Sequence, residues 1–572
     1  MKLRLNHCLL YVLFLLISVD IKAQNFENER TSFSHADSVR GTYGSSRDWW
    51  DVLKYDLHVN FDSNEKTVTG QNIIQIKAIK AGKILQVDLQ EPMKLDSVFI
   101  RSNVQFPNSK FGTTTKFKLN NKNITKDGNA YFLYLDDTLQ VGNIHYLFVY
   151  YHGAPREGTN PPWDGGLVWS KDKNKNPWIS IACQELGASV WYPCKDHQQD
   201  EPDSAAIHIT VPDSLIAISN GRLREKINNG NGTTTYHWAV INPINNYNII
   251  PYIGKYVHFD EGDEKFVGEE GVLDMDYWVL DYNLEKAKVH FKDAVRTLKA
   301  FEYWFGPYPF YKDGYKLVEA PYLGMEHQSA VAYGNEYQKG YKGYDLSSSG
   351  WGLKWDYLIV HETGHEWFGN NITTKDIADM WVHESFTCYS ETLFTEYYYG
   401  KEAGNKYVQG LRLNIENDRP LISYYNVNKA GSADIYYKGA NMIHTIRQVI
   451  NNDSLFRNIL RGLNKTFYHS TVTTQEIEQY ISSQSGINFS NVFNQYLRTI
   501  EIPILEYKIK KNTVSFRYTN CIPTFNLPLK TTSKKEQWIY PSTKWKTVKV
   551  SPSENNIFSI DPNFYIKTKK VD

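Results

Sequence analysis

Hydrophobic and polar residues alternate along much of the first half of the chain. The segment YDLHVNF, from Tyr55 to Phe61, has an apolar residue at every second position, which is typical of a strand with one buried side. Short runs of this kind, broken by Gly, Asn, Asp and Pro, continue through residues 208–221 to about residue 256. We therefore expect an all-β domain of sandwich type over residues 45–256.

The periodicity changes from that of strands to that of helices near residue 280. Apolar residues recur at helical spacing from Leu284 to a Gly-Pro break at Gly306. The clearest helix runs from Asp379, a possible N-cap, to Tyr399, with a glycine just after it. Helical patterns end near residue 498, and strand alternation returns in the segment YKIKKNTVSFRY. The pattern predicts a multidomain α+β protein, with a mainly α domain over 257–498 and a small β domain over 499–572.

The first 24 residues have the pattern of a signal peptide. Lys2 and Arg4 precede an apolar run from Cys8 to Val19, and Ala23 stands at a plausible cleavage point. The apolar run is short for a membrane span, although an N-terminal membrane anchor is the alternative interpretation. We expect an exported chain, periplasmic or extracellular, with no transmembrane segment after cleavage.

Composition and charge narrow the possible functions. The 572 residues carry 63 Lys and Arg against 63 Asp and Glu, a length typical of about three or four domains. A net charge of zero offers no field that would attract polyanions, so nucleic-acid binding is disfavoured. Four cysteines remain beyond the signal peptide, too few for a disulfide framework. Cys183 and Cys194 are close enough in sequence to pair, and their pairing stays open.

The stretch YLIVHETGHEWFGN has the spacing of a metal site. Positions i and i+4 share a helix face, so His361 and His365 can offer two imidazoles to one ion. Glu362 lies about 100° round the helix from His361, where it can reach a metal-bound water without being a ligand. The alternative is a buried polar helix whose histidines are satisfied by other core groups.

A third ligand candidate follows on the next predicted helix. Glu384 comes 19 residues after His365, and two histidines with one carboxylate and an open fourth position are typical of catalytic zinc. Glu391, two turns further on, either hydrogen-bonds a ligand imidazole or is a solvated helix carboxylate. His383 points about 100° away from Glu384, which favours a packing or substrate-lining role.

These residues resemble a known family. The pattern HExxH-x18-E, with GMEHQSA upstream, is similar to the aminopeptidase N and leukotriene A hydrolase family of zinc metallopeptidases. The resemblance covers roughly residues 45–572. It implies a β domain, a thermolysin-like catalytic domain and a small β domain, without the large helical C-terminal domain of longer members. It also implies one zinc ion per chain, held by His361, His365 and Glu384.

In that family a GxMEN segment lines the cleft as an edge strand, and its Glu binds the free α-amine of the substrate. The matching positions retain Gly324, Met325 and Glu326 as expected substrate-binding residues. Leu323 replaces the first Gly of the motif and His327 replaces its final Asn. The first replacement puts in doubt the family's close backbone approach at that position.

Two further residues are implied by the resemblance. A second amine ligand lies twelve residues before the Asp of a P-C-x-D segment, which is Asp196 here, so the matching residue is Gln184. Glu185 is the rival, and alternation on a strand would point the two side chains to opposite faces. A catalytic tyrosine precedes Lys-Gly-Ala by two residues, which selects Tyr436, with Tyr437 as an outward-facing neighbour.

The implied activity is removal of N-terminal residues from peptides with a free amine. Zinc would lower the pKa of its bound water toward about 7, Glu362 would act as general base, and Tyr436 would donate to the oxyanion. The alternatives on the same scaffold are a zinc metalloendopeptidase and a leukotriene-type epoxide hydrolase. From a different class, the alternative is a surface adhesin or scaffold without chemistry. No oligomeric state is predicted.

Overall fold

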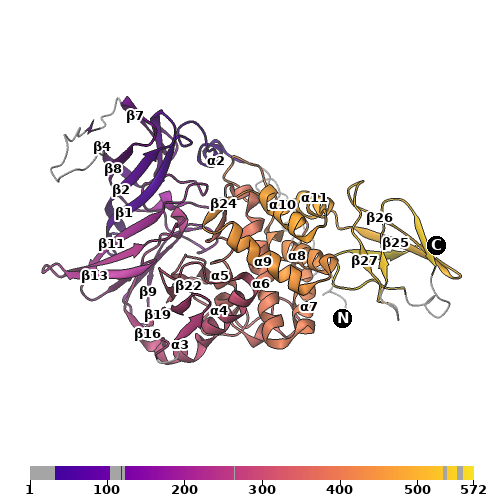
Figure 1. The fold of residues 1–572 in the computed structure, drawn as a ribbon. Helices are drawn as coiled ribbons and strands as arrows, with labels where there is room; N and C mark the ends of the chain where they lie inside the picture. Colours follow the sequence, from indigo (N-terminus) through magenta and orange to yellow (C-terminus); the bar gives the residue numbers. More distant parts are fainter. Residues whose placement is uncertain (1–32, 103–116, 119–122, 263–264, 533–536, 550–557) are drawn as a thin grey trace, which may run out of the picture.

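The computed structural model describes residues 33–102, 117–118, 123–262, 265–532, 537–549 and 558–572. The predicted signal peptide, residues 1–24, lies outside the described residues. Figure 1 shows three bodies in a row: a β-rich body in indigo to magenta, a helical body in orange, and a small β body in yellow. Within the described ranges, no helix has both the length and the apolar character needed to cross a bilayer.

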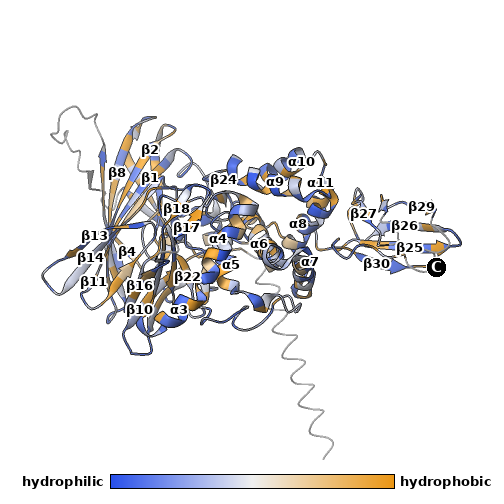
Figure 2. Ribbon diagram, turned by 60° about the horizontal axis from the view of Figure 1, so that its bottom comes forward, coloured by the Kyte–Doolittle hydropathy of each residue, from blue (hydrophilic) through white to orange (hydrophobic). Residues whose placement is uncertain are grey.

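The main sheet of the first body has the order β13-β14-β11-β1-β2-β8-β4-β5. Its strands are β1 (Trp50–Asp62), β2 (Thr67–Ala78), β4 (Lys94–Ser102), β5 (Phe117–Lys118), β8 (Ile144–Gly153), β11 (Ser204–Pro212), β13 (Arg222–Asn228) and β14 (Thr233–Val240). Strand β1 pairs antiparallel with β2 and parallel with β11. The predicted alternation is confirmed, because Tyr55, Leu57 and Val59 are buried while Asp56 and His58 point to the other face. Figure 2 shows hydrophilic and hydrophobic colours alternating along these strands.

Two smaller sheets complete the β-rich body. One has the order β3-β7-β6 and the other has the order β12-β15-β10-β9. Their strands are β3 (Gly82–Asp88), β6 (Ile124–Asp127), β7 (Ala130–Leu139), β9 (Gly166–Lys171), β10 (Pro177–Ala182), β12 (Ile216–Ile218) and β15 (Tyr252–Gly254). The large buried rings of Trp50, Trp191 and Tyr192 belong to the shared core of this body.

The second body combines a five-stranded sheet with helices. The sheet order is β16-β19-β20-β22-β21, from β16 (Tyr256–Asp260), β19 (Met275–Leu280), β20 (Tyr315–Glu319), β22 (Val331–Tyr333) and β21 (Gly324–Met325). Two small pairs are β17 (Phe266–Gly268) with β18 (Gly271–Leu273), and β23 (Ile372–Thr374) with β24 (Ser470–Val472). The helices are α3 (Leu284–His290), α4 (Lys292–Phe305), α5 (Tyr357–Gly364), α6 (Trp381–Tyr399), α7 (Lys401–Gly410), α8 (Tyr437–Ile450), α9 (Asp453–Thr466), α10 (Thr474–Ser485) and α11 (Ser490–Arg498). An additional short helix, α2 (His35–Gly41), precedes the first body.

Two predicted helices differ in detail from the observed ones. The pattern from Leu284 to Gly306 is divided at Phe291, whose ring is buried against Tyr277 and Tyr333. The prediction that Asp379 caps α6 was wrong. A 3-10 turn intervenes, and the Asp379 carboxylate instead accepts hydrogen bonds from the Thr474 amide and the Tyr425 hydroxyl.

The predicted end of α6 is confirmed. Gly400 adopts a φ of 91° immediately after the last helical residue, in the region that favours glycine.

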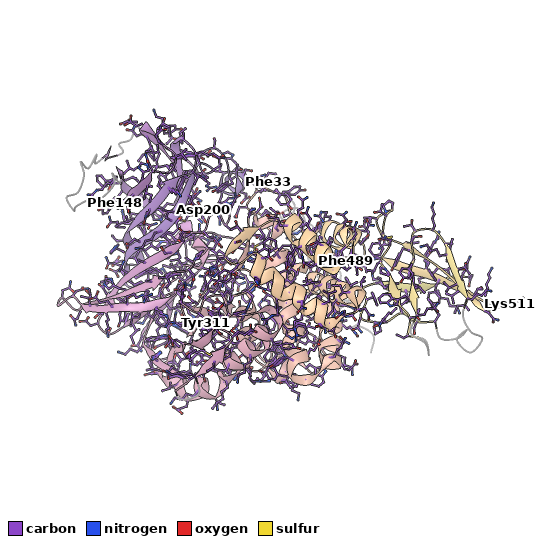
Figure 3. The ribbon with its side chains drawn as sticks, in the orientation of Figure 1. Phe33, Phe148, Asp200, Tyr311, Phe489 and Lys511 are labelled. Atoms are coloured by element: carbon purple, nitrogen blue, oxygen red, sulfur yellow. The ribbon has the colours of Figure 1, made fainter. Side chains whose placement is uncertain are left out.

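The third body is a small antiparallel sheet with one parallel edge. Its order is β29-β26-β25-β30, from β25 (Ile504–Lys510), β26 (Thr513–Thr519), β29 (Lys546–Lys549) and β30 (Lys567–Lys570), with β27 (Leu529–Lys530) and β28 (Trp538–Ile539) beside it. Val514, Phe516 and Tyr518 are buried on one face, as predicted. Lys511, labelled in Figure 3, marks the turn of the β25–β26 hairpin, at the far end from the β-rich body.

Candidate active site

Two closely packed helices carry the predicted metal ligands. Helix α5 begins at Asp356, whose carboxylate accepts a hydrogen bond from the Ile359 amide at 3.1 Å, and every residue of α5 is buried. A Cβ added at Gly364 would lie 2.6 Å from the Ser390 hydroxyl on α6. Glycine at this position therefore lets the two helices approach each other closely, which brings the α6 carboxylate toward the α5 imidazoles.

The three predicted ligands converge on one point. The Glu384 Oε2 atom lies 3.7 Å from His361 Nε2 and 3.4 Å from His365 Nε2, and all three side chains are buried. The same Glu384 oxygen has no hydrogen-bond partner among the described residues. A buried carboxylate oxygen without a partner, facing two imidazole nitrogens, fits a bound cation.

The far sides of both imidazoles are held by hydrogen bonds. His361 Nδ1 donates to Glu391 Oε1 at 2.7 Å, and His365 Nδ1 donates to the Phe368 carbonyl oxygen at 3.0 Å. These bonds place the protons on Nδ1 and leave the Nε2 lone pairs toward Glu384. Tyr407 in turn donates to the other Glu391 oxygen at 2.6 Å. A donor set of two imidazoles and one carboxylate suits Zn²⁺.

The structure decides between the alternatives for two neighbouring residues. Glu391 is fully buried and hydrogen-bonds the His361 imidazole, so it is not a solvated helix carboxylate. His383 is also fully buried, and its Nε2 accepts a hydrogen bond from the Thr374 amide at 2.9 Å. Of its two predicted roles, packing is the one that this contact supports.

Burial and the neighbouring His361 and His365 side chains shift the pKa values of the Glu384 and Glu362 carboxyls. Burial opposes ionisation of Glu384, but His365 and His361 outweigh it and hold its pKa well below the ordinary value. Burial raises the pKa of Glu362 to about 7, although the imidazoles of His361 and His365 act against this shift. A carboxyl with a pKa near neutrality can both accept and return a proton.

The edge strand β21 passes directly over helix α5. It lies at the margin of the five-stranded sheet and pairs only with β22 among the described strands. A Cβ on Gly324 would lie 2.3 Å from Leu358 Cδ1 and 3.0 Å from Glu362 Oε1. Gly324 thus permits the strand to approach Glu362, and Met325 beside it lines the same cavity. The predicted edge strand is confirmed.

Glu326 follows the edge strand and is held by side chains from three other segments. Gln184 Nε2 and the Tyr247 hydroxyl both donate to Glu326 Oε1, the latter at 3.0 Å. Asn370 Nδ2 donates to the Glu326 carbonyl oxygen at 2.9 Å. Tyr247 has no signal in the sequence that could have selected it, because nothing distinguishes it among 41 tyrosines.

Gln184 and Glu185 do not obey strand alternation. Strand β10 ends at Ala182, and the two residues lie in a turn where Glu185 has a φ of 59°. Both residues line the cavity, so the expectation that only one of them can enter the site was wrong. The Glu185 backbone oxygen is held by Arg40, which donates to it at 2.5 Å.

Tyr436 stands immediately before helix α8 and faces the metal ligands. Its ring stacks on the His361 ring with centroids 5.8 Å apart. Burial, with the carboxylates of Glu384 and Glu326, raises the pKa of Tyr436 well above its ordinary value, so the phenol keeps its proton. Tyr437 lines the same cavity and is not the outward-facing neighbour that the sequence suggested.

The predicted site residues surround one cavity of about 590 Å³. Its wall also contains residues that the sequence did not indicate: Trp163, Tyr341, Leu346, Tyr357 and Leu358. A second cavity of about 560 Å³ shares Trp163, Gln184, Glu185 and Tyr436 with the first. The two cavities therefore lie side by side, with these residues between them.

Comparison with known families finds a matching domain for each of the two large bodies. Residues 52–247 match the Peptidase M1 N-terminal domain, and residues 289–496 match the Peptidase family M1 domain. The chain belongs to peptidase family M1. The residues of the candidate centre, His361, His365 and Glu384, all fall inside the second match.

Individual members of family M1 show how far the likeness extends. The chain is 23% identical to Aminopeptidase M1 of Arabidopsis thaliana over 372 residues, which are 62% of this chain and 40% of that protein. It is 24% identical to Leukotriene A-4 hydrolase of Xenopus laevis over 353 residues, 57% of this chain and 54% of the relative. The chain thus spans about half the length, or less, of these relatives.

A solved structure shares the fold. The M1 zinc metallopeptidase of Deinococcus radiodurans superposes with a TM-score of 0.65 at 20% sequence identity, over 80% of this chain and 96% of that chain. The β-rich body followed by a mainly helical body is therefore the arrangement of this family's fold.

Proposed function

We propose that this chain is a zinc-dependent aminopeptidase, which hydrolyses the first peptide bond of substrates with a free N-terminus. The observation that carries the proposal is the position of Glu326. Its carboxylate accepts hydrogen bonds from Gln184 and Tyr247. Glu326 lines the same cavity as the convergent ligands His361, His365 and Glu384. The Deinococcus radiodurans neighbour is an M1 zinc metallopeptidase that has been solved, as a mutant, with a Tyr-Ser-Ala substrate.

The reaction divides between the metal and two side chains, Glu362 and Tyr436. A bound zinc ion supplies a Lewis acid for the scissile carbonyl and lowers the pKa of water toward about 7. Glu362, which lines the cavity beside the metal ligands, would accept the proton of the attacking water and pass it to the leaving amine. The Tyr436 phenol, which remains protonated, donates to the carbonyl oxygen as negative charge develops there.

Exopeptidase selectivity follows from the position of Glu326 in the same cavity as the metal ligands. The α-amine of a peptide is cationic in much of the population at neutral pH, and an ionised Glu326 offers it a charge-assisted hydrogen bond. Anchoring the amine beside the metal ligands leaves the first peptide bond within reach of Glu362. An internal segment of a long peptide has no such cation, which disfavours endopeptidase activity.

Amine recognition is tested by Glu326→Ala. The wild type should hydrolyse a free-amine substrate far better than its N-acetylated form, because acetylation removes the cation. The variant should lose about 10- to 100-fold in kcat/KM on the free-amine substrate, the value of a hydrogen bond to a charged group, and lose this preference. Kinetic assays on matched aminoacyl and acetylaminoacyl substrates measure both effects.

The neighbouring carboxylate provides the control for this prediction. Glu185→Ala removes a carboxylate from the same cavity, but not the one to which Gln184 and Tyr247 donate, and should retain the preference for the free amine. Equal hydrolysis of both substrates by the wild type would instead favour a metalloendopeptidase.

The oxyanion contact is tested by Tyr436→Phe. Removing the phenol hydroxyl should lower kcat by about 10²- to 10³-fold with little change in KM, because the hydroxyl acts chiefly when charge develops on the carbonyl oxygen. Tyr437→Phe removes a hydroxyl from the adjacent position of the same cavity and should stay within a few-fold of wild type. If the two variants behave alike, Tyr436 is not the donor.

We also propose that the protein is exported after removal of residues 1–24. The support is the charged start, the short apolar run and the alanine at position 23. Sequencing the N-terminus of protein expressed with its own leader tests this. A mature chain beginning near Asn25 is expected, and an intact Met1 would contradict it.

A further inference from the structure

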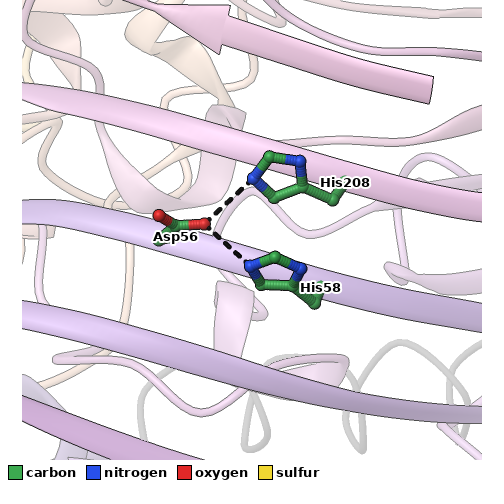
Figure 4. A group of neighbouring side chains, drawn as sticks. All are labelled: Asp56, His58 and His208. Atoms are coloured by element: carbon green, nitrogen blue, oxygen red, sulfur yellow. Dashed lines mark hydrogen bonds and ion pairs between the residues drawn. The ribbon is translucent and has the colours of Figure 1, made fainter. Parts of the chain in front are cut away.

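A row of histidines crosses the outer face of the main sheet, far from helices α5 and α6. His58 on β1 stands opposite His208 on β11, and His208 stands opposite His237 on β14. Asp56 lies two residues before His58 on the same strand and the same face. Figure 4 shows both the His58 and His208 rings directed at the Asp56 carboxylate.

The three side chains in Figure 4 meet at a single carboxylate oxygen. Asp56 Oδ1 lies 3.1 Å from His58 Nε2 and 3.0 Å from His208 Nε2. The two imidazoles stack with centroids 4.2 Å apart and 20° between their planes, so their Nε2 atoms point the same way. Lys54 Nζ contacts the other oxygen, Asp56 Oδ2, at 3.3 Å and leaves Oδ1 to the histidines.

We propose that Asp56, His58 and His208 form a second metal site, which takes a late divalent transition metal ion such as Zn²⁺, Ni²⁺ or Cu²⁺. Imidazole and carboxylate donors suit these ions. Zinc bonds of about 2.0–2.2 Å at tetrahedral angles separate neighbouring donors by about 3.3 Å, close to the 3.1 and 3.0 Å between Asp56 Oδ1 and the two nitrogens. All three donor atoms lie within 4.8 Å of one another. The His58 side chain is 48% exposed, which gives an ion access from solvent.

His237 completes the surroundings of this site. Its Nδ1 hydrogen-bonds His208 Nδ1, so that when His208 binds an ion through Nε2, its Nδ1 proton has an acceptor. This arrangement repeats the one at His361, where Glu391 accepts the Nδ1 proton. Two charged residues of opposite sign lie beside this group. Lys54 contacts Asp56, and Glu225 on β13 stands opposite His237 on β14.

Asp56 contributes the one carboxylate of the set, and its Oδ1 atom faces both imidazoles. A bound ion would tie β1 to β11, two strands that pair in parallel although they are about 150 residues apart in the sequence.

Zinc stoichiometry tests the proposal. The holoenzyme is dialysed to equilibrium against micromolar Zn²⁺, and its metal content is measured. The wild type should hold two zinc ions per chain, whereas His58→Gln and His208→Gln should each hold one and keep wild-type peptidase activity. His258→Gln is the matched control, because His258 also contacts an aspartate, Asp276 at 2.7 Å, on an exposed sheet face. The pair of His258 and Asp276 has only one imidazole and does not form a chelating site. The His258→Gln variant should therefore still hold two zinc ions per chain.

A further set of variants assigns the ions to their sites. A His361→Ala, His365→Ala double variant should retain one zinc ion, and adding His208→Gln should leave none. His237→Ala should weaken the remaining site by about 10- to 100-fold, the usual effect of losing such an acceptor. Equal zinc contents for the wild type and His208→Gln would overturn the second site, whatever the outcome at His361.

Discussion

Glu362→Gln is expected to lower kcat by about 10²- to 10⁴-fold while the protein keeps its zinc, because general acid–base catalysis contributes on that scale. The amide has nearly the same shape as the carboxyl but cannot accept the proton of the attacking water. Glu362 follows the ligand His361 on α5, and its carboxylate is not the one that faces both imidazoles, so metal content should not change. Steady-state kinetics together with metal analysis measures both quantities.

A nearby glutamate on the same segment gives the matched control. Glu366 is buried, accepts hydrogen bonds from the Ser329 amide at 2.9 Å and the Tyr308 hydroxyl at 3.1 Å, and has its pKa raised to about 8 by burial. It is therefore largely uncharged at neutral pH, and Glu366→Gln should keep activity within a few-fold of wild type. Activity of Glu362→Gln at that same level would exclude Glu362 as the general base.

Glu384→Ala is expected to abolish hydrolysis and zinc binding at the centre formed with His361 and His365. The variant leaves the imidazoles of His361 and His365 without the carboxylate that faces them at 3.7 and 3.4 Å. Two neutral donors in a buried site hold zinc poorly, because the ion's charge is no longer balanced there. Loss of the Lewis acid, worth several kcal/mol, corresponds to a fall in kcat/KM of about 10³-fold or more.

Metal analysis and kinetics after dialysis measure this loss, and restoration by added metal distinguishes it from unfolding. Wild-type protein stripped with a chelator should regain its activity when zinc is returned. Glu384→Ala should stay inactive in the same zinc solution while its circular dichroism remains that of the wild type. A variant that binds as much zinc as the wild type and cleaves free-amine peptides at the wild-type rate would refute the assignment of the third ligand.

Local patterns predicted most of the fold and failed where tertiary contacts decide. The alternation of β1 and the glycine end of α6 follow from residues close in sequence, and both were confirmed. The N-cap at Asp379 failed because its carboxylate is taken by Thr474, about a hundred residues further along the chain. The alternation of Gln184 and Glu185 failed because a turn begins where a continued strand was assumed.

The sequence by itself determined the chemistry of the metal centre, because helical periodicity alone puts His361 and His365 on one face and Glu362 beside them. Only the tertiary structure decided what surrounds that centre. Tyr247 reaches Glu326 from another segment, and His208 reaches Asp56 across a parallel strand pair. Contacts of this kind depend on how elements far apart in the sequence pack together. Hydrophobic periodicity and motif spacing report local structure, so they do not identify the residues that meet in such contacts.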